Sequence, residues 1–409
     1  MPKKLQIGLL GEHLGHSYSP EIHAALADYD YRLIELQHSE LADFIRAGDF
    51  DGLNVTIPYK EAVIPLLDTL SPVAARIGAV NTIVRERNGK LCGHNTDYEG
   101  LAALIRANGI SPKGKKVLIL GSGGASKAAV CVIEDMGGTP VTVSRKGENN
   151  YENLSRHGDA AILINATPVG MYPQNGQAPL SLSAFPTLEA VIDLIYNPLR
   201  TALLMEAERL GITAANGLYM LVAQAAAACA LFTGQAPEKA LVGKITQKMT
   251  VRTENIILIG MPGCGKTTLG RRIAADLSRR FVDADEMLES ECGIKIPDIF
   301  KQEGEAGFRA RESEILKKLG RERGLVIATG GGAVTVAENY QHLHQNGKIL
   351  FLDTPPTGLP TEGRPLSTAH TPEELYKKRL PLYRAFADIT VAITRNVEEN
   401  LIRMKEALL

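Results

Sequence analysis

Residues 260–268 read Gly-Met-Pro-Gly-Cys-Gly-Lys-Thr-Thr, which is the spacing of a phosphate-binding loop. Glycines in such a loop let backbone N–H groups surround phosphate oxygens, and the N-terminus of the following helix adds positive charge. Lys266 is expected to reach the terminal phosphates of ATP, and Thr267 to ligate Mg²⁺. The predicted nucleotide contacts are Gly260, Gly263, Cys264, Gly265, Lys266, Thr267 and Thr268.

Two carboxylates follow this loop. Asp283 and Asp285 are two residues apart at the end of a strand-like run, so strand alternation predicts that both face one side. One can organise Mg²⁺, and the other can orient an attacking hydroxyl. Arginines at 309, 364 and 379 suit two further tasks, which are to hold the transferred phosphate and to hold a substrate carboxylate.

A second glycine loop, residues 121–126, reads Gly-Ser-Gly-Gly-Ala-Ser after the apolar run 117–120. This is a variant of the dinucleotide-binding fingerprint. The next strand ends in Ser144-Arg145-Lys146, with two cations where an NAD enzyme carries Asp or Glu. Cations suit a 2′-phosphate, so NADP is favoured over NAD. The predicted cofactor contacts are Gly121, Gly123, Gly124, Ala125, Ser126, Ser144, Arg145 and Lys146.

The first 100 residues are dense in hydroxyl, amide and charged residues, in the runs 16–20, 54–60, 79–82 and 94–97. Such groups are costly to bury unless they bind one another or a polar ligand. A small, anionic, polyhydroxylated ligand would use them all. Serines and Thr56 could hold its carboxylate, while Asn81, Lys60 and Asp97 could surround a reacting carbonyl or hydroxyl.

The elements that must position these groups alternate along the chain. Apolar strand-like runs are expected at 117–120, 141–143, 161–164, 191–194, 256–259, 325–328 and 349–352. Helical stretches separate them, one with Leu269, Ile273 and Leu277 on one face, which predicts parallel sheets with crossover helices. Residues 221–231 are expected to form a buried, alanine-rich helix, and the polar segment 246–254 a linker.

Composition sets broad limits. The chain has 409 residues, a net charge of −1 and five scattered cysteines. Two or three domains are expected, and neither a nucleic-acid nor a membrane partner is indicated. The cysteine pattern and the absence of a signal peptide predict a cytoplasmic protein without a disulfide framework. The oligomeric state is left open, with a homo-oligomer among the options.

Residues 1–245 resemble shikimate dehydrogenases over their whole length, on motifs that occur in the family's order. These include His16-Ser17-x-Ser19-Pro20, Asn54-Val55-Thr56-x-Pro58-x-Lys60, Asn95-Thr96-Asp97, Tyr196-Asn197-Pro198 and Asn216-Gly217. The resemblance implies a catalytic pair, Lys60 and Asp97, and a cofactor contact at Gly217. It implies substrate contacts at Ser17, Ser19, Thr56, Asn81, Tyr196 and Gln224.

Residues 254–409 resemble shikimate kinases, on Asp-x-Asp, Phe-Arg-x-x-Glu, Gly-Gly-Gly, Arg-Pro-Leu and Arg-x-Pro-Leu-Tyr. By this resemblance Asp285 activates the shikimate hydroxyl, Lys266 and Arg364 serve the transferred phosphate, and Asp283 lies near the metal with Thr267. Substrate contacts are implied at Arg309, Arg379, Gly330, Gly331 and Gly332. The lid stretch 353–363 is shorter than usual and has Thr357 where an arginine is usual.

The implied architecture is α/β throughout. It has a substrate domain (1–108 and 217–245), a Rossmann-type NADP domain (109–216) and a P-loop kinase domain (254–409). The implied function is reduction of 3-dehydroshikimate by NADPH, followed by ATP-dependent phosphorylation of shikimate. Quinate dehydrogenation remains an alternative for the first half, because Ser17, Lys60 and Asp97 would serve both substrates. A nucleotide-sensing module is the alternative for the second half, although Asp285, Arg309 and Arg379 favour a kinase.

Overall fold

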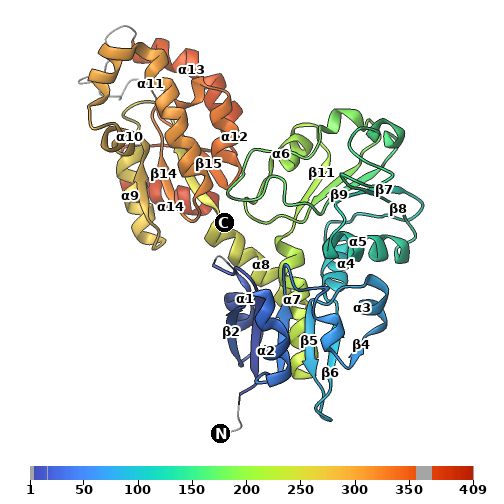
Figure 1. Ribbon diagram of the computed structural model, residues 1–409. Helices are drawn as coiled ribbons and strands as arrows, with labels where there is room; N and C mark the ends of the chain where they lie inside the picture. The colour runs from blue at the N-terminus through green and yellow to red at the C-terminus, as the bar shows by residue number, and fades with distance from the viewer. Residues whose placement is uncertain (1–3, 16, 356–370, 409) are drawn as a thin grey trace. The chain divides into compact units, whose positions relative to one another are not determined.

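A computed structural model describes residues 4–15, 17–355 and 371–408. The chain forms two compact units (Figure 1). The first contains Met1–Gly170, Gln177–Tyr196 and Leu203–Met249, and the second contains Met171–Gly176, Asn197–Ala202 and Thr250–Leu409. Two short segments from the range expected for the NADP domain thus belong to the second unit.

The first sheet of the first unit is mixed, in the order β2-β1-β3-β5-β6-β4. Its strands are β1 (Gln6–Gly11), β2 (Asp30–Glu35), β3 (Gly52–Val55), β4 (Thr69–Leu70), β5 (Thr82–Arg85) and β6 (Leu91–His94). Strands β1, β2 and β3 are parallel, whereas β5 is antiparallel to both β3 and β6. The accompanying helices are α1 (Ser19–Leu26), α2 (Leu41–Ala47), α3 (Pro72–Ile77), α7 (Leu218–Thr233) and α8 (Lys239–Thr253).

The second sheet is parallel, in the order β11-β10-β9-β7-β8. Its strands are β7 (Lys116–Leu120), β8 (Thr139–Val143), β9 (Ile162–Asn165), β10 (Ala190–Asp193) and β11 (Thr213–Asn216), with helices α4 (Asp97–Ala107), α5 (Gly124–Asp135) and α6 (Ala202–Arg209). Ile119 and Ile164 join a core with α4 and α5, whereas Leu118 and Leu163 join a core with α6 on the other face. Burial on both faces explains the continuous apolar runs in the sequence.

The second unit has a parallel sheet in the order β13-β14-β12-β15-β16. Its strands are β12 (Asn255–Ile259), β13 (Phe281–Asp283), β14 (Val326–Ala328), β15 (Gly347–Asp353) and β16 (Ile389–Ala392). Its helices are α9 (Lys266–Asp276), α10 (Ala284–Cys292), α11 (Ile296–Arg321), α12 (Glu338–His344), α13 (Pro372–Phe386) and α14 (Val397–Leu408). The α/β class and the parallel sheets with crossover helices are confirmed.

The boundary between the two units, at Met249–Thr250, falls within the polar segment 246–254 that was expected to be a linker. Residues 246–253 of this segment form the second half of α8, anchored by buried Ile245 and Met249 at i, i+4 spacing. Two local expectations were wrong. Leu277 is exposed because α9 ends at Asp276, so only Leu269 and Ile273 of that predicted face are buried. Asp285 does not lie on a strand, since β13 ends at Asp283.

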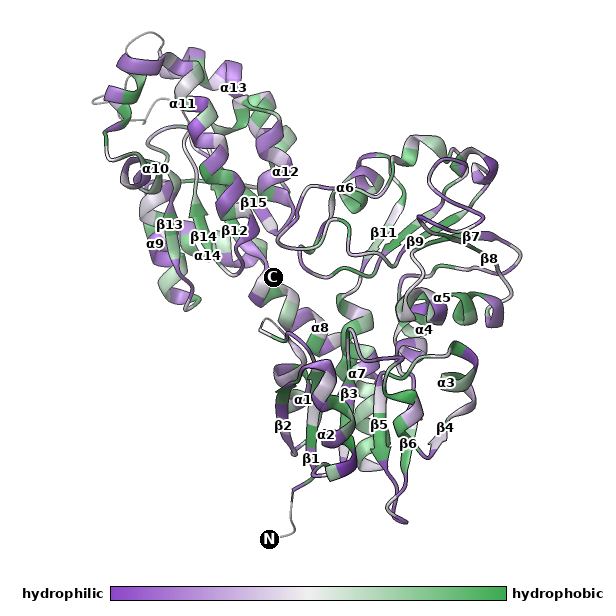
Figure 2. Cartoon of the chain, in the orientation of Figure 1, coloured by the Kyte–Doolittle hydropathy of each residue, from purple (hydrophilic) through white to green (hydrophobic). Residues whose placement is uncertain are grey.

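Hydropathy follows this architecture. The strands carry most of the hydrophobic colour in Figure 2, while charged residues gather on helix surfaces and loops. The predicted alanine-rich helix is α7, and its buried residues include Ala225, Ala228 and Cys229. Over the described ranges, no helix is both long enough and apolar enough to cross a membrane.

Candidate active sites

The mixed first sheet brings four sequence motifs to one edge. Leu10 of β1 is in register with Val55 of β3, so the residues that follow these strands, 12–15 with 17–19 and 56–60, leave the sheet side by side. Strand β5 runs the other way and begins at Thr82, opposite His94 at the end of β6. Residues 79–82 and 95–97 therefore lie at the same edge, and motifs that are up to about 80 residues apart in sequence share one site.

Lys60 and Asp97 form an ion pair at this edge. Lys60 Nζ lies 2.5 Å from Asp97 Oδ2, and the two side chains are 20% and 10% exposed. The backbone around Lys60 is fixed, because its carbonyl accepts from Val80 N–H and the adjacent Tyr59 is fully buried. Asp97 is the first residue of α4, where the helix dipole favours a carboxylate. The pair is thus held between a loop and a helix N-terminus.

Asn81 hydrogen-bonds to Asp97 and fixes the orientation of its carboxylate. Its Nδ2 donates to Asp97 Oδ1 at 2.9 Å and to Thr96 Oγ1 at 3.1 Å, while its Oδ1 accepts from Thr96 N–H at 2.6 Å. Thr96 Oγ1 in turn lies 3.4 Å from Gln224 Oε1 on α7. The amide of Asn81, which is 3% exposed, is engaged within the protein and holds Asp97 in position, while the substrate contact that the resemblance implies stays a prediction.

Gly100 sets the distance between α4 and α7. A side chain at this position would place its Cβ 2.8 Å from Met220 O and 2.9 Å from Gln224 Cβ. The two helices therefore pack with almost no space between their backbones. Since α4 carries Asp97 and α7 carries Gln224, this contact fixes the spacing of the two helices that carry these residues.

The predicted carboxylate-binding residues lie on the neighbouring loops. Ser19 is buried at the start of α1, and its N–H donates to Ser17 Oγ at 3.2 Å. Thr56 follows β3, and its N–H donates to Leu10 O. The ring of Tyr196 is 5.4 Å from that of Tyr18, which lies between the two serines in sequence. His16 of the same motif lies outside the described residues.

The glycine loop before α5 adjoins Lys60. Gly121 has φ +117°, and Ser126 Oγ donates to its carbonyl at 2.7 Å. An added Cβ at Gly124 would lie 3.6 Å from Lys60 Cδ and 3.4 Å from Ala79 Cβ. Gly123 caps α5, and Ala125 lies in the first turn of that helix. The loop therefore places the N-terminus of α5 next to the Lys60–Asp97 ion pair.

The cations expected to meet a 2′-phosphate follow β8, next to β7 in the sheet. Arg145 and Lys146 are exposed, and Ser144 N–H donates to Asn149 O at 3.1 Å, which shapes the turn. At Gly217 an added Cβ would collide with Leu194 O, so the position requires glycine, and the cofactor contact expected there stays a prediction.

In the second unit, the phosphate loop joins β12 to α9. Gly260, Gly263 and Gly265 all have positive φ, which only glycine adopts readily. Lys266 is buried and its Nζ donates to the carbonyls of Gly260 and Met261 at 2.9 and 3.0 Å. The loop's own carbonyls thus hold the ammonium in place.

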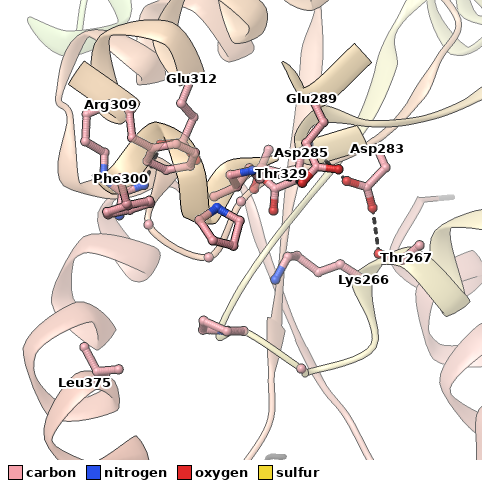
Figure 3. Close-up of a pocket in the computed structure, with 18 of the residues that line it drawn as sticks. Lys266, Thr267, Asp283, Asp285, Glu289, Phe300, Arg309, Glu312, Thr329 and Leu375 are labelled. Carbon is pink, nitrogen blue, oxygen red and sulfur yellow. Dashed lines mark hydrogen bonds and ion pairs between the residues drawn. The ribbon is translucent and has the colours of Figure 1, made fainter. Parts of the chain in front are cut away.

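The loop opens into a cavity of about 730 Å³. Its lining includes most of the predicted site, namely Gly263, Gly265, Lys266, Thr267, Thr268, Asp283, Asp285, Arg309, Gly330, Gly331, Gly332 and Arg379. Glu289, Lys295, Phe300 and Glu312 also line it, and the sequence assigned none of them a role. Figure 3 shows Lys266, Asp283 and Asp285 around one part of the cavity, with Arg309 and Phe300 further along.

Asp283 and Asp285 reach this cavity by different means. Asp283 caps α10 with Oδ1 and accepts from Thr267 Oγ1 through Oδ2 at 2.7 Å. Asp285 lies in the first turn of α10, and its buried Oδ1 has no hydrogen-bond partner within the described residues. Burial, and then the charges of Glu312 and Asp283, raise the pKa of Asp285 to about 6. These are the properties of a carboxylate that accepts a proton near neutral pH.

Arg309 and Arg379 supply positive charge. Arg309 Nη1 donates to Glu312 Oε2 at 2.6 Å, with Glu312 fully buried and its pKa raised by burial. Arg379 Nη1 donates to Gly331 O at 3.2 Å. Glu312 was within reach of sequence reasoning, because Phe-Arg-x-x-Glu places it one helical turn after Arg309.

At positions 330–332 only glycine fits, because a side chain at any of them would collide with a neighbouring group. A side chain at Gly330 would collide with Glu312 Oε1, and one at Gly332 would collide with Arg309. At Gly331 the Cβ would lie 2.6 Å from Pro262 Cγ of the phosphate loop. The glycine stretch thus packs directly against the charged groups. Arg364 and Thr357 lie outside the described residues. The expected role of Arg364 at the transferred phosphate therefore stays a prediction.

Comparison with known proteins decides the family. A curated shikimate dehydrogenase (NADP(+)) from Syntrophomonas wolfei is 35% identical over 275 residues, which cover 59% of this chain and 93% of the relative. The chain belongs to the shikimate dehydrogenase family. Residues 9–83 match the shikimate dehydrogenase substrate binding domain, and residues 262–408 match the shikimate kinase family.

Solved structures agree with this assignment for the dehydrogenase half. Shikimate dehydrogenase 1 from Peptoclostridium difficile is 39% identical and superposes with a TM-score of 0.55, over 60% of this chain and 97% of the other. The Thermus thermophilus enzyme, solved in complex with NADP(H) and shikimate, is 33% identical with a TM-score of 0.55 over 60% and 99%. A fusion with chorismate mutase from Clostridium acetobutylicum is similar at 34% identity.

Proposed function

We propose that this chain catalyses two consecutive reactions, the NADPH-dependent reduction of 3-dehydroshikimate and the ATP-dependent phosphorylation of the resulting shikimate. The observation that carries the proposal is that each unit holds one complete reactive group. The first holds the 2.5 Å Lys60–Asp97 pair beside a dinucleotide loop, and the second holds Asp285 in a cavity that begins at a phosphate loop. All five cysteines are free, which supports a cytoplasmic location.

For the dehydrogenase, the residues fit NADP(H). The strand β8 ends in Ser144 and the exposed cations Arg145 and Lys146, which suit a 2′-phosphate, and the loop at Gly121–Gly124 suits a pyrophosphate. When bound, NADPH supplies the hydride. Lys60 stabilises the negative charge that develops on the substrate carbonyl oxygen and donates a proton to it. Asp97 orients the Lys60 ammonium, and Asn81 orients Asp97.

For the kinase, Asp285 accepts the proton of the substrate hydroxyl as this oxygen becomes the nucleophile. Arg309 and Arg379 supply charge for the substrate carboxylate, and Lys266 stabilises charge on the phosphates. Thr267 Oγ1 and Asp283 Oδ2, 2.7 Å apart, form an oxygen donor pair that fits Mg²⁺, which prefers a few protein oxygens together with water and phosphate. With Mg²⁺ bound, ATP supplies the phosphoryl group.

The experiment is to measure ADP release that depends on shikimate, together with NADPH formation from shikimate and NADP⁺, in the purified full chain. Both activities are expected. Quinate in place of shikimate tests the alternative dehydrogenase, and faster turnover of quinate would reverse the substrate assignment. ATP binding without shikimate-dependent ADP release would instead support a nucleotide-sensing module. The buried Oδ1 of Asp285, which has no hydrogen-bond partner among the residues the structure describes, argues against it.

A further inference from the structure

A turn in the second unit is buried although its sequence is polar. His344 is the last residue of α12, and Gln345 and Asn346 connect this helix to β15. These three residues are only 6%, 4% and 1% exposed. Connecting turns with such side chains normally lie on the surface. Their burial therefore requires a segment that covers them and satisfies their polar atoms.

The covering segment comes from the first half of the sequence. Residues 171–176 and 197–202 belong to the second unit. Leu199 N–H donates to Asn346 Oδ1 at 2.9 Å, and Arg200 N–H donates to Gln345 O at 2.9 Å. From the other segment, Asn175 Nδ2 donates to Gln345 Oε1 at 2.7 Å. These contacts include backbone groups of the segment, so the turn binds the segment by its main chain as well as its side chains.

The side chain of Arg200 adds a charged anchor. Its Nη1 donates to His344 O at 3.1 Å, and its Nη2 lies 3.1 Å from Glu254 Oε1. Arg200 and Glu254 are 25% and 15% exposed, so this ion pair is shielded from much of the solvent. Glu254 immediately precedes β12, the strand that leads into the phosphate loop.

Asn346 links the same contact to β12. Its carbonyl accepts from Asn255 N–H at 2.7 Å, and its Nδ2 donates to Gly320 O at 3.2 Å. The side chain of Asn255 in turn accepts from Leu325 N–H at 2.9 Å. Asn346 thus hydrogen-bonds to three parts of the chain, which are segment 197–202, the first residue of β12 and the C-terminal part of α11.

We infer that turn 344–346 is a docking surface for an intrachain partner, the segment 197–202, supported by Asn175 of segment 171–176. The second unit is therefore completed by two segments that lie about 50 and 75 residues before Thr250, where its main part begins. This inference goes beyond the two proposed reactions. Loops 171–176 and 197–202 directly follow Gly170 and Tyr196, so the backbone of the dehydrogenase motifs is continuous with the completed kinase unit.

Hydrogen exchange in the full chain tests the inference. The substitution Asn346→Ala removes the acceptor of Leu199 N–H, so exchange of the amides of Leu199 and Arg200 should become at least about tenfold faster. The matched control is Gln341→Ala, an exposed residue of the preceding helix, which should leave both amides unchanged. Unchanged exchange at 199–200 in Asn346→Ala would overturn the inference.

A second variant covers the case in which Asn346→Ala does not fold. Arg200→Met keeps the length of the side chain but removes its charge, and should accelerate exchange at 344–347, whereas Arg209→Met at an exposed arginine of α6 should not. Equal exchange at 344–347 in both arginine variants would contradict the docking surface. Neither measurement depends on turnover, so loss of the proposed activities would not imitate failure of this inference.

Discussion

Asp285 and Glu312 each turn a buried carboxylate oxygen toward Gly330, and neither oxygen has a hydrogen-bond partner within the described residues. The two oxygens come from different helices, α10 and α11. Their proximity raises the proton affinity of Asp285, although burial is the larger cause. The Asp285 carboxylate is therefore protonated in acid, and at neutral pH it is ionised and able to accept a proton.

The first prediction is a pH profile. Because the pKa of Asp285 is raised to about 6, the carboxylate is ionised above that pH and protonated below it. The kcat/KM of the kinase for shikimate should therefore fall tenfold per pH unit below about pH 6, since this parameter reports the free enzyme. A profile that stays flat to pH 5 would show that Asp285 does not act as the base.

The second prediction separates the two reactions. Lys60→Ala should lower dehydrogenase kcat by roughly 10²–10⁴-fold, because it removes the proton donor, and should leave phosphorylation intact. The control Lys90→Ala, at an exposed lysine, should leave both rates unchanged. Equal damage to both activities in Lys60→Ala would contradict two independent sites.

The converse prediction concerns Asp285→Asn. This change keeps the shape of the side chain but removes the proton acceptor, so shikimate-dependent ADP release should fall by about 10²–10⁴-fold. ATP binding, measured by calorimetry, and dehydrogenase turnover should remain. Retained ADP release would indicate that another residue of the cavity acts as the base.

The fourth prediction is cofactor choice. Arg145→Ala removes a charge-assisted contact of roughly 1.5–3 kcal/mol, so KM for NADPH should rise about 10–150-fold while KM for NADH changes little. Arg156→Ala, another exposed arginine of the same domain, is the control and should affect neither cofactor. A similar rise for both cofactors would refute recognition of the 2′-phosphate by Arg145.

The fifth prediction is steric. In Gly330→Ala the new methyl group would collide with Glu312 and would lie 2.9 Å from Asp285 Oδ1. Displacing the base by about 1 Å costs on the order of 100-fold in rate, so kinase kcat/KM should fall by that amount. Gly243→Ala, in helix α8 with open space around it, should leave kinase activity unchanged and stabilise the chain by up to about 1 kcal/mol. Equal kinase activity in the two variants would show that the cavity tolerates the methyl group.

Seven strands of the two parallel sheets were predicted to within about two residues, because burial on both faces makes each run continuously apolar. The edge strands β11 and β16 were not predicted, since each is only partly buried and has no continuous apolar run. The position of Asp285 was misjudged for a local reason. Asp283 ends its strand and caps the next helix, a role that Asp commonly takes, so the alternation expected of a strand stops there. Helix α8 was missed because its polar composition hides the Ile245–Met249 spacing.

Other features depend on distant parts of the chain. The burial of Gln345 and Asn346 depends on residues about 150 positions earlier, and no local pattern reports it. The engagement of Asn81 with Thr96 and Asp97 depends on the antiparallel pairing of β5 with β6. In both cases the residue types were visible in the sequence, but their partners were set by the topology.

The close packing at Gly100 indicates how this dehydrogenase could acquire a wider substrate range. Position 100 touches no reacting group, yet any side chain there must push α7 away from α4, because Met220 O and Gln224 Cβ occupy the space. Gln224, an expected substrate contact, would retreat from Thr96 as the helices separate and would leave more room beside the expected substrate. Selection for bulkier ring acids should therefore enrich alanine or serine at a position that lies behind the catalytic residues.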